Sequence, residues 1–552
     1  MGKITVYRAK KVLTMDPGRP VAEAVAVMDG RVVSTGTIES MQPWLKRYEH
    51  EIDDTLAGKV VMPGLIDPHT HFAISSGFMA LHYLGPIESP GPQGMNAPLR
   101  THADVLAKLR AAHAAQKDPA QPLVAWGLDP ASQGGHLDRD ELDTISRERP
   151  IWVITYAPHY VYTNSAAIAR IGVAQDTTIH GVGHYPDGRL NGVFLEIEAT
   201  RLALAGMATE LNKGGGVAGV RRMADIARRS GITTTAEMIF GWTDFDFEWK
   251  MHDEAVNAAD FPIRMGLVPL ENPLFKKHGA RSAEFLKEVE KRSNDKLFFH
   301  GIKFLSDGSF PAMSLRLNFP GYLDGGNGVR NDVPWDELHD RMLPFWKAGI
   351  PIHCHANGDE AIDASLDALA QLQATQPRFD HRFTLEHYCI STPEQARRLK
   401  ALGGLASVNC YFVHFRSLLH SDQGFGPDRS QAIARLGSLE REGVPFALHS
   451  DYSLVVAPMH PLTAAWIAVN RVALDGRTVM APGERIGVAR AMRAITIDAA
   501  YVLGLERKVG SLEPGKLADF AILEQDPFEV PPERLKDIPI WGTALGGRLQ
   551  PA

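Results

Sequence analysis

The chain has 552 residues, a formal net charge of −7 and 44% hydrophobic residues. These values exclude a disordered scaffold and give no electrostatic reason to expect a nucleic-acid partner. No stretch resembles a transmembrane span, and the N-terminus enters a strand without the apolar core of a secretion signal, so we expect no membrane partner. Three cysteines cannot form a disulfide framework, which predicts a cytoplasmic protein.

Both ends of the chain have the pattern of short strands. Residues 3–9, 21–27 and 31–36 predict strands separated by turn residues. The tail from 510 to about 522 returns to the same alternation. We therefore expect the two ends to pair into one domain.

Between the ends, apolar strand-like runs alternate with helical patterns. The runs cover residues 123–126, 151–156, 299–305, 350–354 and 445–450, and the helical patterns cover 217–230, 336–348 and 359–374. Such alternation is typical of parallel βαβ units. The sequence therefore predicts an α/β fold.

The most informative motif is the apolar run 60–72, which contains His69 and His71. Alternate side chains of a strand share a face, so these two imidazoles can bind one cation. Two histidines on one strand face can also be merely solvated or packed. The pair alone is weak evidence for a metal.

Four further apolar runs also end in polar residues. They are HGIKFLSDG (300–308), PIHCHANGD (351–359), FTLEH (383–387) and PFALHSD (445–451). Parallel barrels place their chemistry at the carboxyl ends of the strands. A buried ammonium is costly, so Lys303 needs a partner or a chemical change. Taken singly, Lys303 could be salt-bridged, His387 a core residue and Asp451 a helix cap, but five such elements in order favour a metal site.

These motifs resemble the metal-dependent amidohydrolase superfamily and, within it, amidohydrolase family 3, the YtcJ-like branch. The matching segments are PGLIDPHTH (63–71), GIKFLSDGS (301–309), HCHANGD (353–359), LEH (385–387), HSD (449–451), HYVYTNSAAI (159–168), GRLNGVFLE (188–196) and GSLEPGKLADFAIL (510–523). The resemblance implies a distorted (β/α)8 TIM barrel at 63–500, with an insertion at about 120–215. It also implies a small composite β-sandwich built from residues 1–62 and 501–552.

The resemblance further implies two divalent metal ions, zinc by default, with Mn, Fe, Co or Ni as alternatives. The implied ligands are His69, His71, Lys303, His355, His387 and Asp451. Lys303 is implied to be carbamylated, a carboxylated lysine that bridges the ions. The implied catalytic residues are Asp451, as general base and acid, together with Lys303 and His355.

The implied activity is hydrolysis of an amide-type C–N bond by a metal-activated hydroxide. Ester hydrolysis, decarboxylation and isomerisation on the same site are the alternatives, and a metal-free scaffold is the least favoured because all six ligands are present. The implied assembly is a homodimer or homotetramer. The implied partner is a small-molecule substrate.

Aromatic residues near the motifs favour a hydrophobic or aromatic N-acyl or formamide-like substrate, although they could equally be ordinary packing residues. The candidate pocket residues are His159, Asn164, Glu196, Trp126, Phe412 and His353. His353 could support the metal ligands or replace one of them. Glu196 could instead form a surface salt bridge, and Glu237 stands where relatives usually have aspartate.

Overall fold

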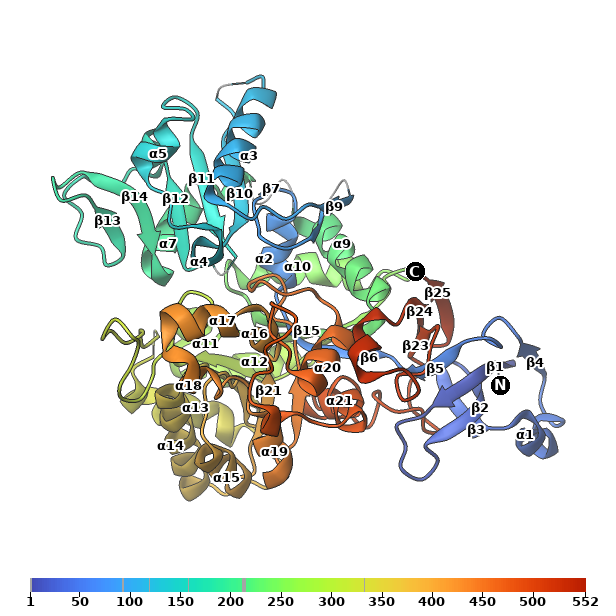
Figure 1. Cartoon of the computed structure of the whole chain (residues 1–552). Coiled ribbons are helices and arrows are strands. Elements are labelled where there is room, and N and C mark those ends of the chain that lie inside the picture. Colours follow the sequence, from blue (N-terminus) through green and yellow to red (C-terminus); the bar gives the residue numbers. More distant parts are fainter. Residues whose placement is uncertain (1, 92–93, 119, 157, 211–214, 332) are drawn as a thin grey trace. The chain divides into compact units, whose positions relative to one another are not determined.

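The computed structural model describes the chain except for residues 1, 92–93, 119, 157, 211–214 and 332 and the side chains of 196–198. The chain forms two compact units (Figure 1). The first comprises Met1–Thr70, Ala224–Asp451 and Met459–Ala552, and the second comprises His71–Met223 and Tyr452–Pro458.

Both chain ends contribute to one eight-stranded sheet of the first unit. Its strands are β1 (Ile4–Leu13), β2 (Val21–Met28), β3 (Arg31–Gly36), β4 (His50–Asp53), β5 (Val60–Pro63), β23 (Phe520–Leu523), β24 (Ile540–Leu545) and β25 (Arg548–Pro551). The order is β25-β24-β23-β5-β1-β2-β3, with β4 beside β1. The C-terminal β23 pairs with β5, so the two ends meet as expected. The strands form one continuous sheet.

Apolar residues of these strands pack into two buried clusters. Val12, Val25 and Phe520 belong to a buried cluster. Ile4 and Ala24 belong to a second cluster, together with residues of α1 (Ile38–Leu45). Because successive strand residues point to opposite faces, the alternation covers both faces of the sheet with apolar side chains.

The rest of the first unit contains two parallel sheets. One has the order β17-β16-β15-β6, and the other the order β18-β19-β20-β21-β22. The strands are β6 (Leu65–Thr70), β15 (Ile232–Phe240), β16 (Arg264–Pro269), β17 (Leu297–Phe299), β18 (Ile302–Leu305), β19 (Ile352–Ala356), β20 (Thr384–His387), β21 (Leu405–Val408) and β22 (Phe446–Leu448). Nearly all their residues are buried, as expected for parallel strands covered on both faces.

Helices connect these strands. They are α10 (Phe245–Val256), α11 (Glu271–His278), α12 (Ser282–Glu290), α13 (Leu338–Lys347), α14 (Asp359–Thr375), α15 (Pro393–Ala401), α16 (Tyr411–Phe415), α17 (Ser417–Leu419), α18 (Gly426–Ser430), α19 (Leu436–Glu442), α20 (Pro461–Asn470), α21 (Val488–Ala494) and α22 (Ile497–Val502). The strand predicted at 299–305 is interrupted at Gly301. This residue has a φ of 73°, and a Cβ there would lie 2.8 Å from the carbonyl oxygen of Pro351.

The two parallel sheets approach each other at both edges. Leu270 and Lys303 form an isolated parallel bridge. On the other side, the Asp451 N–H donates to the His69 carbonyl oxygen at 3.0 Å. The ladders nevertheless form separate sheets and no closed ring among the described strands. The α/β prediction is confirmed, whereas the closed (β/α)8 barrel is not.

The second unit contains a six-stranded sheet with the order β13-β14-β12-β11-β10-β7. Its strands are β7 (His82–Tyr83), β10 (Leu123–Leu128), β11 (Ile151–Thr155), β12 (Tyr160–Thr163), β13 (Val182–His184) and β14 (Leu190–Leu195), and β8 (Ser89–Gly91) and β9 (Gly94–Asn96) form a hairpin. Its helices are α2 (Phe72–Phe78), α3 (His102–Ala115), α4 (Pro130–Gln133), α5 (Arg139–Asp143), α6 (Ser165–Ile171) and α7 (Glu196–Ala205), and α9 (Gly216–Arg229) begins in it. The unit starts at His71, earlier than the insertion expected at about 120–215, because β7 already pairs with β10.

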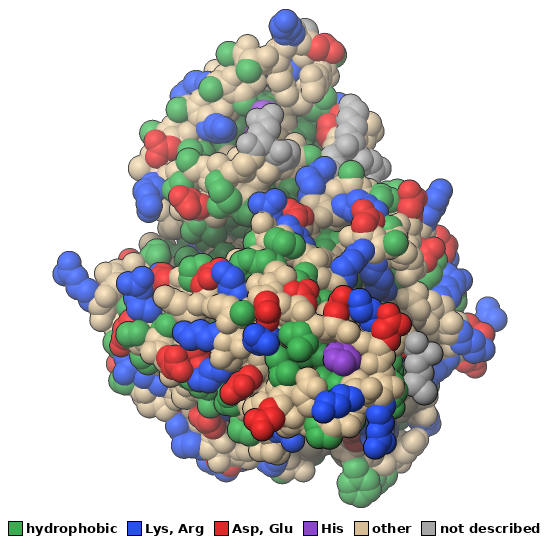
Figure 2. All heavy atoms as spheres, turned by 90° about the vertical axis from the view of Figure 1, so that its right-hand side faces the viewer, with side chains coloured by type: hydrophobic (Ala, Val, Ile, Leu, Met, Phe, Trp, Pro, Cys, Tyr) green, Lys and Arg blue, Asp and Glu red, His purple; other side chains and the backbone are tan. Residues whose placement is uncertain are grey.

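No helix among the described residues has the length and apolar character needed to span a membrane. Cys354, Cys389 and Cys410 are buried and free. Figure 2 shows positive and negative side chains interspersed over the displayed face, in keeping with the small net charge.

Candidate metal centre

Polar side chains gather where the parallel strands of the first unit end. β6 supplies His69, β20 supplies His387, and His449 and Asp451 follow β22. His387 and Asp451 have positive φ values of 72° and 58°. Such backbone conformations are uncommon for residues other than glycine, and they concentrate at functional sites.

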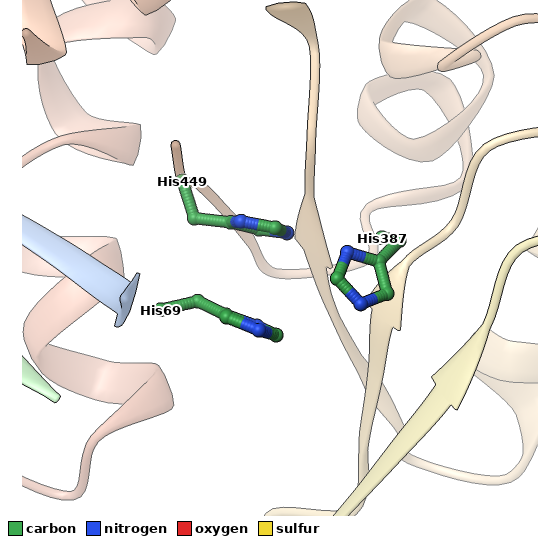
Figure 3. Close-up of side chains that lie close together, drawn as sticks. All are labelled: His69, His387 and His449. Atoms are coloured by element: carbon green, nitrogen blue, oxygen red, sulfur yellow. The ribbon is translucent and has the colours of Figure 1, made fainter. Parts of the chain in front are cut away.

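Three buried imidazoles lie together at this position (Figure 3). The rings of His69 and His449 are stacked, with centroids 4.4 Å apart and planes 13° apart. The His387 ring lies 4.8 Å from the first and 5.1 Å from the second. One nitrogen from each ring lies within 4.8 Å of those of the other two, which is a spacing that can hold a metal ion.

The nitrogens of this cluster are suited to bind a cation. Neither ring nitrogen of His449, nor Nδ1 of His387, has a hydrogen-bond partner among the residues that the structure describes. Burial lowers the pKa of both rings well below the usual histidine value. The neutral imidazole is the form that ligates metals. The residues present therefore fit a metal ion.

Glu386 contacts two further ring nitrogens. Its Oε2 lies 2.6 Å from Nδ1 of His69, and its Oε1 lies 2.6 Å from Nδ1 of His353. Burial alone would raise the pKa of Glu386, but His69, His353 and Lys303 together lower it well below the usual value.

Asp451 lies beside the imidazoles. Its Oδ1 is 3.2 Å from Nε2 of His69, and its Oδ2 is 3.8 Å from Nδ1 of His387. Asp67 of β6 accepts the N–H of Ser450 at 3.1 Å. Burial raises the pKa of Asp67 to about 6, and the hydrogen bonds from Ser450 oppose that rise. β6 therefore holds the segment after β22 at two points.

Lys303 is only 1% exposed, and its Nζ makes no hydrogen bond to any described residue. Burial lowers its pKa, while the charges of Glu386 and Asp451 raise it. The structure thus gives no support to the interpretation of Lys303 as an ordinary salt-bridged lysine.

The structure places His355 at the edge of the cluster. Its ring lies 4.5 Å from that of His387. Its Nε2 is 3.1 Å from the carbonyl oxygen of Gly308 and 2.8 Å from Nδ2 of Asn357, so this nitrogen is engaged by loop groups. His71 is buried and is the first residue of the second unit.

Asp307 and Asp359, two acidic residues of the predicted motifs, accept hydrogen bonds from backbone N–H groups. Asp307 accepts the N–H groups of Asn357 and Gly358, both at 2.9 Å, and so ties the loop after β18 to the end of β19. Burial raises the pKa of Asp307 to about 7, and these hydrogen bonds oppose that rise. Asp359 is the first residue of α14 and accepts the N–H groups of Asn318 and Glu360.

The candidate pocket residues are distributed over both units. In the second unit, Trp126 packs against Phe78, Tyr83 and Tyr156, and His159 is partly buried. In the first unit, Phe412 stacks on Phe310 at 4.5 Å. Glu196 begins α7, and its side chain lies outside the described part.

Asn164 has a structural role in the second unit. Its Oδ1 accepts the N–H groups of Ile151 and Ala167, and its Nδ2 donates to the carbonyl oxygens of Ser146 and Arg149. It thereby caps α6 and joins that helix to β11. These four bonds engage both ends of the side-chain amide.

His449 and Glu386 are not among the site residues predicted from the sequence. Both stand in motifs of the sequence, HSD and LEH. For His449, the signal was a histidine two residues before Asp451 at a strand end, the same spacing as His69 and His71. For Glu386, the signal was a carboxylate in an apolar run directly before a predicted ligand.

Known proteins resemble this chain over most of its length. A model of the amidohydrolase family matches residues 52–550. Protein LONG AFTER FAR-RED 3 of Arabidopsis thaliana is 27% identical, over 97% of this chain and 90% of its own length. An N-substituted formamide deformylase of Arthrobacter pascens is 23% identical, over 98% of this chain and 96% of its own length. A metal-dependent hydrolase from Pyrococcus horikoshii has the same fold, with a TM-score of 0.72 and 19% identity over 96% of this chain and 99% of its own. The chain therefore belongs to the amidohydrolase family.

Proposed function

We propose that the protein is a metal-dependent hydrolase that cleaves an amide-type C–N bond in a hydrophobic or aromatic N-acyl or formamide-like small molecule. The observation that carries this proposal is the cluster of three buried imidazoles beside the Asp451 carboxylate. The name of the relative from Arthrobacter pascens, an N-substituted formamide deformylase, supports the C–N bond as the target.

The ligands that the geometry favours are His69, His387, His449 and Asp451. A bound divalent cation, zinc by default, would polarise a carbonyl group and lower the pKa of a water molecule. The family resemblance adds His71, Lys303 and His355 as ligands of a two-ion centre. It also supports treating the two parallel sheets as the arcs of a distorted (β/α)8 barrel.

Asp451 is the proposed general base and acid. Its Oδ1 is held 3.2 Å from Nε2 of His69, and its own N–H is tied to β6. From that position the carboxylate takes a proton from the attacking water and passes it to the leaving nitrogen.

Lys303 is the proposed site of carbamylation. The neutral amine adds to carbon dioxide, forms an N–C bond and releases a proton, which leaves an anionic carbamate. The burial of Nζ without a hydrogen-bond partner among the described residues supports this change, because a carbamate supplies oxygens that can bind a cation. His355 stays a proposed catalytic residue beside His387.

The preference for an aromatic substrate is supported by the segments that follow β18 and β21. Phe310 lies in the loop after β18 and Phe412 lies in α16 after β21, and their rings stack. The carboxyl ends of neighbouring parallel strands meet at one edge of a sheet, so this apolar pair lies at the same edge as His387. A cytoplasmic location and a homodimer or homotetramer stay predictions.

The test combines elemental analysis of the purified protein with a turnover screen. The panel contains aromatic and aliphatic N-acyl compounds, formamides, the matched esters, and carboxylates. Bound metal with turnover of amides or formamides is the expected result. If only esters are turned over, the protein is an esterase. If only decarboxylation or only isomerisation is observed, the protein is a decarboxylase or an isomerase. Protein without metal would overturn the proposal.

A further inference from the structure

Glu386 joins three strands through two short contacts. It lies on β20, His69 lies on β6 and His353 lies on β19. All three residues are fully buried, and both carboxylate–imidazole distances are 2.6 Å. β6 belongs to one parallel sheet, and β19 and β20 belong to the other. One carboxylate therefore connects the two sheets directly behind the imidazole cluster.

The chemistry of these contacts determines the proton positions. Each carboxylate oxygen of Glu386 lies 2.6 Å from one Nδ1 atom, so each imidazole donates to it from Nδ1. In a neutral ring, this leaves Nε2 as the acceptor. Nε2 of His69 lies 3.2 Å from Oδ1 of Asp451, which is also an acceptor. Two acceptors at this distance repel each other unless they share a proton or a cation.

His353 differs from His69 in what its Nε2 faces. A Cβ built on Gly301 would lie 3.3 Å from Nε2 of His353 and 3.0 Å from its Cδ2. Gly301 stands at the break just before β18, at the amino end of that strand. The imidazole cluster lies at the opposite, carboxyl ends of the parallel strands. His353 is therefore placed to hold Glu386 and not to ligate the metal.

We propose that Glu386 is a positioning residue of the metal centre, which holds His69 in the tautomer that presents Nε2 to the cation, with His353 as its second anchor. This inference rests on the proposed function, because it assumes a bound metal. Carboxylate partners of ligating histidines set ring orientation and ligand basicity, and their loss typically weakens metal binding about 10–100-fold.

The test is the affinity of the folded apoprotein for Zn²⁺, measured by chelator competition without any substrate. Glu386→Gln keeps the shape but offers one acceptor and one donor, so one of the two rings must change its tautomer. We expect the dissociation constant to rise about 10–100-fold. The Co²⁺-substituted variant should also show an altered absorption spectrum, which a purely structural role would not produce.

Glu248→Gln is the matched control. Glu248 is another buried carboxylate of the first unit, and its side chain accepts the N–H groups of Gly241 and Thr243. Its replacement should leave the Zn²⁺ affinity unchanged. His353→Asn should weaken binding less than Glu386→Gln does. An equal or greater loss in His353→Asn would make His353 a ligand and overturn its assignment as an anchor.

The outcomes separate this inference from the proposed function. Wild-type protein that binds no divalent metal would overturn the proposed function and the inference with it. Wild-type protein that binds Zn²⁺, with unchanged affinity in Glu386→Gln, would overturn the inference alone. If Glu386→Gln does not fold, Glu386→Asp serves in its place, because the shorter carboxylate reaches only one ring. Unchanged Zn²⁺ affinity in Glu386→Asp would likewise overturn the inference alone.

Discussion

Both units of the molecule bury basic side chains, and Arg149 of the second unit differs from Lys303 of the first in its hydrogen-bond partners. Arg149 of the second unit is 2% exposed, and its guanidinium donates to the carbonyl oxygens of Gln116, Asp118 and Gln121. Lys303 of the first unit is 1% exposed, and its Nζ has no hydrogen bond to a described residue. Buried polar groups normally find partners. The hydrogen bonds of Arg149 hold loop carbonyl groups in place, whereas the buried Lys303 is the residue for which carbamylation is proposed.

The same difference extends to the neighbours of each residue. Asn164 of the second unit uses its whole amide to hold backbone groups. In the first unit, His449 and His387 keep ring nitrogens that no described residue engages. Burial alone therefore does not mark a functional site, but buried donors and acceptors that gather without partners do.

The largest effect is expected from replacement of Asp451, the proposed general base in the first unit. Asp451→Asn should lower turnover about 10²–10⁴-fold, because an amide cannot accept the proton. The circular dichroism spectrum should stay that of the wild type. Retained turnover in a folded, metal-loaded variant would assign the proton transfer to another group.

The next prediction compares the two buried cations directly. Lys303→Ala should lose bound metal and lower turnover. Loss of a residue that only supports a ligand typically costs about 10–100-fold, and we expect the loss of turnover here to be at least as large. Short carboxylates added to the buffer should restore part of both, since they can replace a carbamate. Arg149→Met is the control, and it should destabilise the fold without changing metal content. Full metal occupancy in Lys303→Ala would contradict the bridging role.

Metal removal should destabilise the protein. Zinc at about 100 times its dissociation constant should add about 2.7 kcal/mol to the free energy of unfolding, because it binds only the folded state. Thermal unfolding of the chelated and reloaded protein measures this difference. Identical melting curves for the two forms would argue against a site built from folded-state imidazoles.

The smallest effect is expected at Asn164, which sequence analysis placed in the substrate pocket. Asn164→Ala should reduce the free energy of unfolding by about 1 kcal/mol through the lost helix cap. kcat/KM should stay near the wild-type value. A large fall in kcat/KM with unchanged stability would instead return Asn164 to the pocket.

The sequence alone determined the local elements and the chemistry at their ends. The helix predicted at 359–374 is α14, Asp359–Thr375, and the one predicted at 336–348 contains α13, Leu338–Lys347. The family was also evident from the motifs and is confirmed. These features depend on periodicity and on residues close in the chain, which a sequence displays directly.

Only the tertiary structure decided which side chains meet. Glu386 contacts His69 across 317 positions of chain and His353 across 33. The stacking of His449 on His69 likewise joins β6 to the end of β22. Such contacts depend on strand register and on how sheets approach each other, and no local pattern encodes either. For the same reason, the early start of the second unit at His71 and the hydrogen bonds of Asn164 to Ser146 and Arg149 could not be predicted from the sequence.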